Sequence, residues 1–101
     1  MFVYNVTTKV QHAIADQWLQ WIKQEHIPQI IGTGCFLEAT ILHLSEATDE
    51  EGPTYAIQYK APTKEHYQDF LDRFSNEMSK KSIDKWGDRV IAFRTLMEIV
   101  G

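Results

Sequence analysis

The sequence predicts an α+β fold whose elements follow the order strand, helix, strand, strand, helix, strand. Short segments either alternate between apolar and polar residues or are apolar throughout, as strands do. In two longer segments, apolar residues instead recur every three or four positions, as in amphipathic helices. The 101 residues are enough for one hydrophobic core, so we expect one domain over residues 1–101.

The first strand and the first helix follow from these two periods. Residues 2–9 alternate between two faces, which predicts a strand. A one-sided apolar stripe then starts at Ile14 and continues through Trp18 and Trp21. Because one face of such a helix packs on the core, both tryptophans are expected to point inward.

The first helix is expected to end or kink near His26. Pro28 has no backbone N–H and disfavours helical geometry in the residue before it. Alternation resumes over residues 36–44, which predicts a second strand with two fairly apolar faces. The polar residues 45–53 that follow are suited to an exposed hairpin loop.

The second half of the chain supplies the third strand, the second helix and the last strand. Residues 55–59 alternate, and Thr63 is placed to cap the following helix. The apolar stripe of that helix is expected to pack in the core and consists of Tyr67, Phe70, Leu71, Phe74 and Met78. Ile83 and Trp86 are expected in a short turn, and residues 90–100, apolar on both faces, predict the last strand.

This order of elements is the split βαβ arrangement of ferredoxin-like folds, a four-stranded antiparallel sheet with both helices on one face. The second and fourth strands are apolar on both sides, so the other face would be an aggregation-prone patch in water. Pairing with a second copy through this face, as in a dimeric α+β barrel, covers it most simply. A different protein docking there is the alternative.

Charge and composition exclude several classes of partner. A net charge of −4 argues against nucleic-acid binding, which needs clustered lysine and arginine. The sequence shows neither a signal-peptide pattern nor an apolar run of bilayer length, so we expect no membrane association and a cytoplasmic location. Cys35, the only cysteine, is expected to be buried and inert. No histidine has a second one at ligand spacing, and we expect neither a metal nor a cofactor.

Six short motifs spread over nearly the whole chain resemble those of one family: Tyr4-Asn5-Val6-Thr7, Trp18 with Trp21, Glu25-His26-Ile27-Pro28, Gly34 with Phe36, Gln58-Tyr59 and Phe93-Arg94-Thr95. That family consists of short bacterial proteins described only as a domain of unknown function. More distantly, the chain looks like the dimeric α+β barrel superfamily. Members of that superfamily include cofactor-free monooxygenases of antibiotic biosynthesis, haem-degrading enzymes, muconolactone isomerases and stress-response barrels, so the resemblance implies a homodimer and leaves the chemistry open.

The resemblance to haem-degrading members is incomplete. In those enzymes an asparagine on the first strand, an aromatic residue on the third and a histidine on the second helix line the pocket. Asn5 and Tyr59 match the first two positions, although Tyr59 stands where a tryptophan is expected. Residues 74–79 contain no histidine that could bind iron, so the resemblance does not support haem degradation.

Glu25 is an unusual residue for its position in the first helix. At about 100° per residue it falls among Ile14, Trp18 and Trp21, on the apolar stripe. A carboxyl group in that position fits a general acid or base, with His26 beside it as a second titratable group. The alternative is that Glu25 emerges at the rim of the core and pairs with a lysine or arginine.

Arg94 is the second unusual residue, a permanent charge within the apolar residues 90–97. Such a side chain requires an anionic partner. It could bind the carboxylate of a ligand through two hydrogen bonds, or it could pair with Glu38 across an intersubunit contact.

Two functions are therefore compared. In the first, a pocket between sheet and helices binds a small apolar or aromatic molecule, with acid–base or monooxygenase-like chemistry that needs no cofactor. The residues expected to line this pocket are Asn5, Trp18, Trp21 and Tyr59, with Glu25, His26 or Arg94 as polar groups. In the second, the chain is a non-catalytic homodimeric module that acts through a protein partner. An empty, enclosed cavity of roughly several hundred Å³ beside Glu25 would favour the first function, and a filled core the second.

Overall fold

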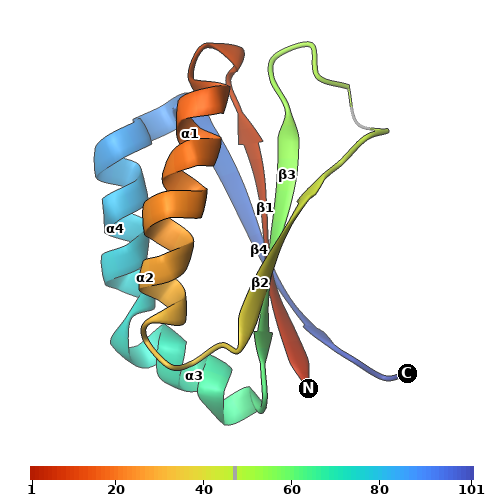
Figure 1. Ribbon diagram of the computed structural model, residues 1–101, viewed down its shortest axis with the longest axis vertical. Helices are drawn as coiled ribbons and strands as arrows, with labels where there is room; N and C mark the ends of the chain where they lie inside the picture. The colour runs from red at the N-terminus through yellow and green to blue at the C-terminus, as the bar shows by residue number, and fades with distance from the viewer. Residues whose placement is uncertain (47) are drawn as a thin grey trace.

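Four antiparallel strands form one sheet in the computed structural model, which describes residues 1–46 and 48–101 (Figure 1). The strands are β1 (Phe2–Val10), β2 (Glu38–His43), β3 (Thr54–Ala61) and β4 (Val90–Glu98). They lie in the order β2-β3-β1-β4, with β2 and β4 at the edges. This confirms the predicted ferredoxin-like α+β fold. Residues 45–53 connect β2 to β3 as expected, except that Ala47 lies outside the described residues.

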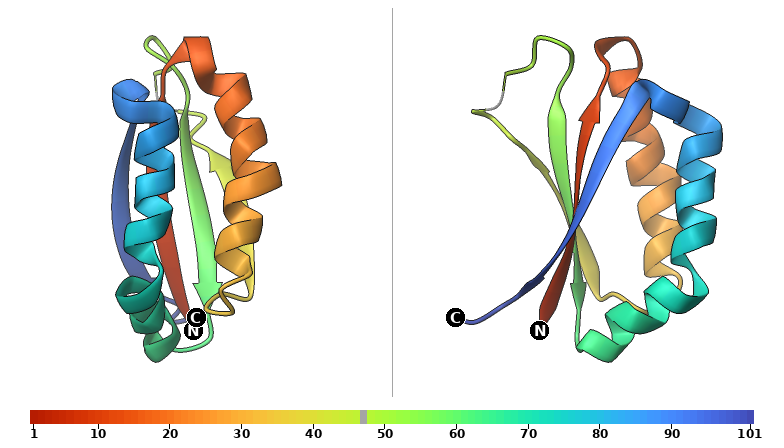
Figure 2. Two further views of the ribbon diagram at one scale, coloured as in Figure 1. Left: turned by 90° about the vertical axis from the view of Figure 1, so that its left-hand side faces the viewer. Right: turned by 180° about the vertical axis from the view of Figure 1, so that it is seen from behind.

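The helical segments form a layer on one face of the sheet and leave the other face bare (Figure 2). After β1 come a 3-10 turn, η1 (His12–Ile14), then α1 (Ala15–Trp21), a π-helical turn, η2 (Ile22–His26), and α2 (Ile27–Ile31). After β3 come α3 (Lys64–Arg73), α4 (Ser75–Trp86) and a second 3-10 turn, η3 (Gly87–Arg89). The one-sided cover is the arrangement that the element order predicts.

The first helical segment passes through Pro28, so of the two alternatives expected near His26, an end or a kink, the end is wrong. Helical structure continues to Ile31, and the backbone adapts through η2 just before the proline. At the end of η2, the N–H of Ile27 donates to the carbonyl of Ile22, five residues back. A proline cannot donate to the carbonyl four residues before it, and its ring conflicts with that group. The wider π turn accommodates both effects.

The second helical segment is broken at Phe74, where φ is −128°. Its start is confirmed, because the Thr63 hydroxyl accepts a hydrogen bond from the backbone N–H of His66 at 3.3 Å. The expected short turn at Ile83 and Trp86 is wrong, since α4 continues to Trp86. Serines interrupt the apolar pattern on the inner side of α4, so hydrophobic periodicity underestimates the length of the helix.

An aromatic cluster between the sheet and the helices forms the core. Tyr4 of β1 lies 5.4–6.0 Å, between ring centroids, from Phe36, Tyr59, Tyr67 and Phe70. Each of these contacts lies within the range of favourable aromatic pairs. Tyr4 therefore connects the two central strands to α3 and to the segment that leads into β2.

The bare face of the sheet, called here the open face, carries alternate residues of each strand. It exposes large apolar side chains, of which Phe93 of β4 is 67% accessible and Ile91 57%. Strand pairing also aligns one polar row across this face, from Thr40 through Gln58 and Asn5 to Thr95. The open face therefore combines apolar edges with a polar row.

Candidate functional site

A cavity of about 60 Å³ lies between the sheet and the helices. The strands contribute Tyr4, Val6, Thr8, Ile57, Tyr59, Val90, Ala92 and Arg94, and the helices contribute Trp18, Ile22, His26, Ile30, Phe70, Ser75, Met78, Ser79 and Ser82. Most of this lining is apolar, so the few polar groups stand out. Because Arg94 is exposed as well as lining the cavity, solvent can reach the cavity from that end.

Arg94 reaches this cavity because of the register of β4. It pairs with Val6, whose side chain also lines the cavity, so Arg94 lies on the helix side of the sheet. Its guanidinium donates a hydrogen bond to the Ser79 hydroxyl of α4 at 3.1 Å. No ion pair within the described ranges 1–46 and 48–101 includes Arg94.

Glu38, the partner that the sequence offered for Arg94 across an intersubunit contact, lies on the opposite face of the sheet from Arg94 within one copy. Glu38 lies on the open face, where its carboxylate contacts the Lys60 ammonium at 3.0 Å. Successive strand residues point to opposite faces, and the paired positions put Glu38 and Arg94 on different sides of the sheet. A contact between the open faces of two copies therefore does not bring these two side chains together.

His26 is the titratable group of the helices that lines the cavity. Its ring stacks on Trp21 with the centroids 4.5 Å apart and the planes inclined by 22°. Its Nδ1 atom is buried and has no hydrogen-bond partner among the residues that the structure describes. Burial lowers the pKa of His26 to about 4, and the positive charges of Lys81 and Arg94 act in the same direction. The imidazole is therefore neutral at physiological pH.

Three serines of α4 add hydroxyl groups to the cavity, and sequence reasoning missed them. Ser75, Ser79 and Ser82 are spaced by four and three residues, so they share one face of the helix. That spacing is the signal that could have identified them, because their face also carries Met78 of the predicted core stripe. The hydroxyl of Ser75 donates a hydrogen bond to the carbonyl of Leu71 at 2.9 Å. The hydroxyl of Ser79 instead accepts a hydrogen bond from the Arg94 guanidinium.

Two tyrosine side chains complete the polar lining of the cavity. Burial raises the pKa of Tyr59 well above its usual range, and nearby Tyr4 adds to the effect. Burial likewise raises the pKa of Tyr4, although the Arg94 guanidinium beside it partly offsets that rise. Both phenols are therefore protonated at physiological pH and can donate hydrogen bonds.

The structure brings together four of the residues that the sequence singled out, namely Trp18, His26, Tyr59 and Arg94. Asn5 is elsewhere, because β1 alternation turns it to the open face, opposite Tyr4. There the Asn5 side-chain amide donates to the Thr7 hydroxyl at 2.9 Å. Its expected place in a pocket between sheet and helices is therefore corrected.

Trp21 and Glu25 also lie outside the cavity. They border a separate open groove on the outer surface, together with Trp86 and Lys85 of α4. Glu25 is exposed, so its expected place on the core-facing stripe is corrected. The π turn takes one more residue than an α-helical turn, which shifts the later positions around the helix axis and turns His26 inward instead.

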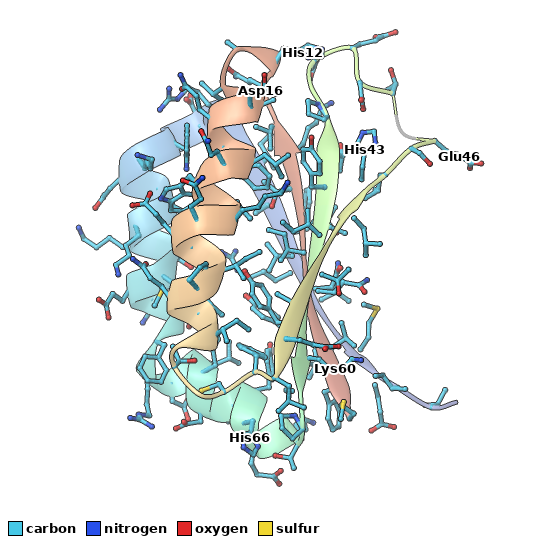
Figure 3. All side chains as sticks on the ribbon, viewed as in Figure 1. His12, Asp16, His43, Glu46, Lys60 and His66 are labelled. Carbon is cyan, nitrogen blue, oxygen red and sulfur yellow. The ribbon has the colours of Figure 1, made fainter. Side chains whose placement is uncertain are left out.

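The remaining histidines do not gather into a site. His12 and His66 lie at opposite ends of the molecule, and His43 lies on the edge strand β2 (Figure 3). Within residues 1–46 and 48–101, no three histidine, cysteine or acidic side chains are close enough to hold a metal ion. In the same residues no helix is long and apolar enough to cross a bilayer.

Comparisons with known proteins identify a family and a fold. The family model described as "Domain of unknown function (DUF4286)" matches residues 1–100. No curated protein matches the chain.

Among solved structures, a dimeric ferredoxin-like protein from an uncultured marine organism has a TM-score of 0.75 at 8% identity, covering 99% of this chain and 95% of that one. HapK from Hahella chejuensis has a TM-score of 0.71 at 11% identity, covering 100% and 94%. An EthD family protein from Bacillus halodurans has a TM-score of 0.68 at 10% identity, covering 99% and 100%. Identities this low show a shared fold.

Proposed function

The chain belongs to the DUF4286 family, and we propose that it acts as a homodimer in which each protomer binds a small organic molecule in the cavity between the sheet and the helices. One observation carries the binding proposal. A mostly apolar cavity contains a guanidinium and a neutral imidazole, from Arg94 and His26. Ligand sites have this composition, with apolar walls for affinity and a few polar groups for orientation.

The size of the cavity limits what can enter it. About 60 Å³ accommodates several water molecules, whereas pockets for drug-sized ligands measure roughly 300–1,000 Å³. The proposed ligand is therefore a molecule of a few heavy atoms or the end of a longer one. The exposed side of Arg94 leaves room for the longer part to extend into solvent.

Proton transfer in this cavity is assigned to His26 rather than to Glu25. His26 lines the cavity and is neutral at physiological pH, so its ring can accept a proton. Glu25 is exposed on the outer groove and has no access to the same ligand. Acid–base chemistry without a cofactor would thus depend on one imidazole held against Trp21.

Self-association through the open face is the second part of the proposal. Exposed Ile91 and Phe93 of β4 and Leu42 of β2 would become buried by a second copy. The protein from an uncultured marine organism that shares this fold is described as dimeric. Two-fold pairing would also place the polar row containing Asn5 and Gln58 against its counterpart, where the amides can bond across the interface.

The binding proposal is tested by nuclear magnetic resonance titration of the labelled protein with propionate, benzoate and their neutral amides. Binding in the cavity should shift the signals of Ile57 and Trp18. Ala92→Val, which adds two methyl groups to the lining, should weaken this binding about tenfold, since filling part of the space that the ligand needs costs about 1–3 kcal/mol. Ala13→Val, the same substitution at an exposed position of η1 away from the cavity, is the matched control and should leave binding unchanged. Shifts confined to the open face would contradict the proposal.

The small cavity volume also favours a second candidate function, a non-catalytic homodimeric module that acts through a protein partner. In that case the aromatic core is essentially closed, and the cavity holds only water. The same titration distinguishes the two functions, because this module predicts no shift at Ile57 or Trp18 with any of the four probes.

A further inference from the structure

We infer that the Arg94 end of the cavity is an anion site and that the small molecule bound there carries a carboxylate. This inference rests on the proposed binding function and adds the chemical class of the ligand. Four features of the described residues support it: the free donors of Arg94, the Ser79 hydroxyl, the neutral His26 ring and the local positive charge.

The first argument concerns the unused hydrogen-bond donors of Arg94. A guanidinium carries five N–H donors in a planar fork. One NH2 group bonds to the Ser79 hydroxyl, and the Tyr4 phenol beside the guanidinium is a second hydrogen-bond partner. Among residues 1–46 and 48–101 no carboxylate forms an ion pair with Arg94. Two parallel N–H donors match the two oxygens of a carboxylate, which is the strongest pairing open to this side chain.

The second argument concerns the groups beside the guanidinium. Ser79 accepts from Arg94 through its oxygen, so its own hydroxyl hydrogen remains able to donate. His26 is neutral, and a neutral imidazole carries one N–H that can donate as well. A carboxylate at this position would therefore be surrounded by donors from β4, α4 and η2, whereas a carbonyl oxygen would use only part of them.

The third argument is the local electrostatic potential. The chain as a whole has a net charge of −4, which disfavours anions. Around His26, however, the nearby charges that affect its protonation are both positive, Lys81 on α4 and Arg94 on β4. Lys81 is partly neutralised, because its ammonium lies 3.8 Å from the Glu77 carboxylate. Arg94 thus remains the main cation facing the cavity.

A structural role alone explains the position of Arg94 less well. Its neighbours on the same side of β4 are Val90, Ala92 and Leu96, which are apolar and partly buried. Another apolar side chain at position 94 would extend that surface. A cation that instead reaches α4 and leaves donors unused is expected where a ligand supplies the missing acceptor.

The test compares each acid with its neutral amide, propionate with propionamide and benzoate with benzamide, in the titration described above. The acids should bind at least about tenfold more tightly, because a carboxylate pairs its charge and both of its oxygens with the guanidinium, whereas an amide offers one neutral oxygen. Arg94→Met should remove this preference, lowering acid affinity about tenfold or more and amide affinity much less. Arg94→Lys, which keeps the charge without the fork, should retain part of the preference.

Arg73→Met is the matched control, because Arg73 is an exposed arginine of α3 that pairs with Asp69 away from the cavity. It should leave the affinities for acids and amides unchanged. Ser79→Ala provides a second variant should Arg94→Met fail to fold, and it should lower acid affinity more than amide affinity. Equal binding of acids and amides at Ile57 and Trp18 would overturn the anion site and leave the proposed binding function standing. Absence of binding by all four probes would overturn both.

Discussion

Arg94 of β4 and Ser79 of α4 are joined by a hydrogen bond of 3.1 Å from the guanidinium to the hydroxyl, on the helix side of the sheet. This contact places the charge of an edge strand beneath the helical layer and beside a mostly apolar cavity. Glu38 lies on the other face of the sheet, where it pairs with Lys60. The two faces of the sheet therefore have different proposed roles, ligand binding beneath the helices and self-association on the open side.

The first prediction concerns the pH dependence of stability through His26. An unfolded histidine binds its proton with the ordinary pKa of 6.5, whereas burial lowers the pKa of folded His26 to about 4, with Lys81 and Arg94 contributing. Between these two values the unfolded state holds more protons, so the free energy of unfolding falls as the pH falls. The contribution of His26 is unchanged above pH 6.5 and decreases by up to about 3 kcal/mol by pH 4.

This dependence can be measured by chemical denaturation of wild type and His26→Gln between pH 7.5 and 4, because the variant lacks the titrating group. Its stability should decline less steeply with falling pH, and the difference between the two curves isolates His26 from all other titrating groups. Identical slopes for the two proteins would contradict the buried, neutral state assigned to this ring.

For the strands, the sequence predicts which residues lie on the same side, but it does not predict which side faces the helices. Alternation along β4 places Val90, Ala92, Arg94 and Leu96 on one side. Both sides of β4 are apolar, however, so hydrophobic patterning could not assign one side to the helices. The strand register decides this, and it depends on pairings between residues far apart in the chain.

The helix carrying His26 and Glu25 shows a different limit of sequence reasoning. A wheel of 100° per residue assumes that every turn is an α-helical turn, and on that assumption Glu25 faces inward. The π turn over Ile22–His26, just before Pro28, changes the direction of the side chains that follow. As a result His26, and not Glu25, faces the cavity. Pro28 predicts a perturbed helix near His26, but the π turn can be identified only from the folded backbone.

The second prediction concerns the dimer. Phe93→Glu should convert it to monomers, because a charge buried in the apolar edge of the interface costs on the order of 2 kcal/mol or more, and two-fold symmetry applies the cost twice. Native mass spectrometry and light scattering would report the mass. Ile83→Glu is the matched control, since Ile83 is 65% exposed, similar to the 67% of Phe93, but lies on α4. A wild-type monomer, or equal loss of dimer in both variants, would contradict pairing through the open face.

The third prediction concerns the loop that leads into β3. Gly52 has φ of +145°, and a Cβ atom there would lie 1.8 Å from the carbonyl oxygen of Val10. Gly52→Ala should therefore lower the free energy of unfolding by about 2 kcal/mol or more, because both the backbone conformation and the space exclude a side chain. Gly101→Ala, where nothing lies within 4 Å, should be neutral in the same denaturant experiment. Equal stability of the two variants would show that the loop packs differently against β1.

The most direct test of the binding proposal is the position of a bound acid, measured by nuclear Overhauser contacts between propionate and the methyl groups of the labelled protein. Our account predicts contacts from the propionate methyl group to Val6 and Ile57, together with a shift of the Arg94 Nε–H signal, because these groups line one cavity. Contacts to Leu42 of the open face, or propionate contacts that persist unchanged in Arg94→Met, would contradict it.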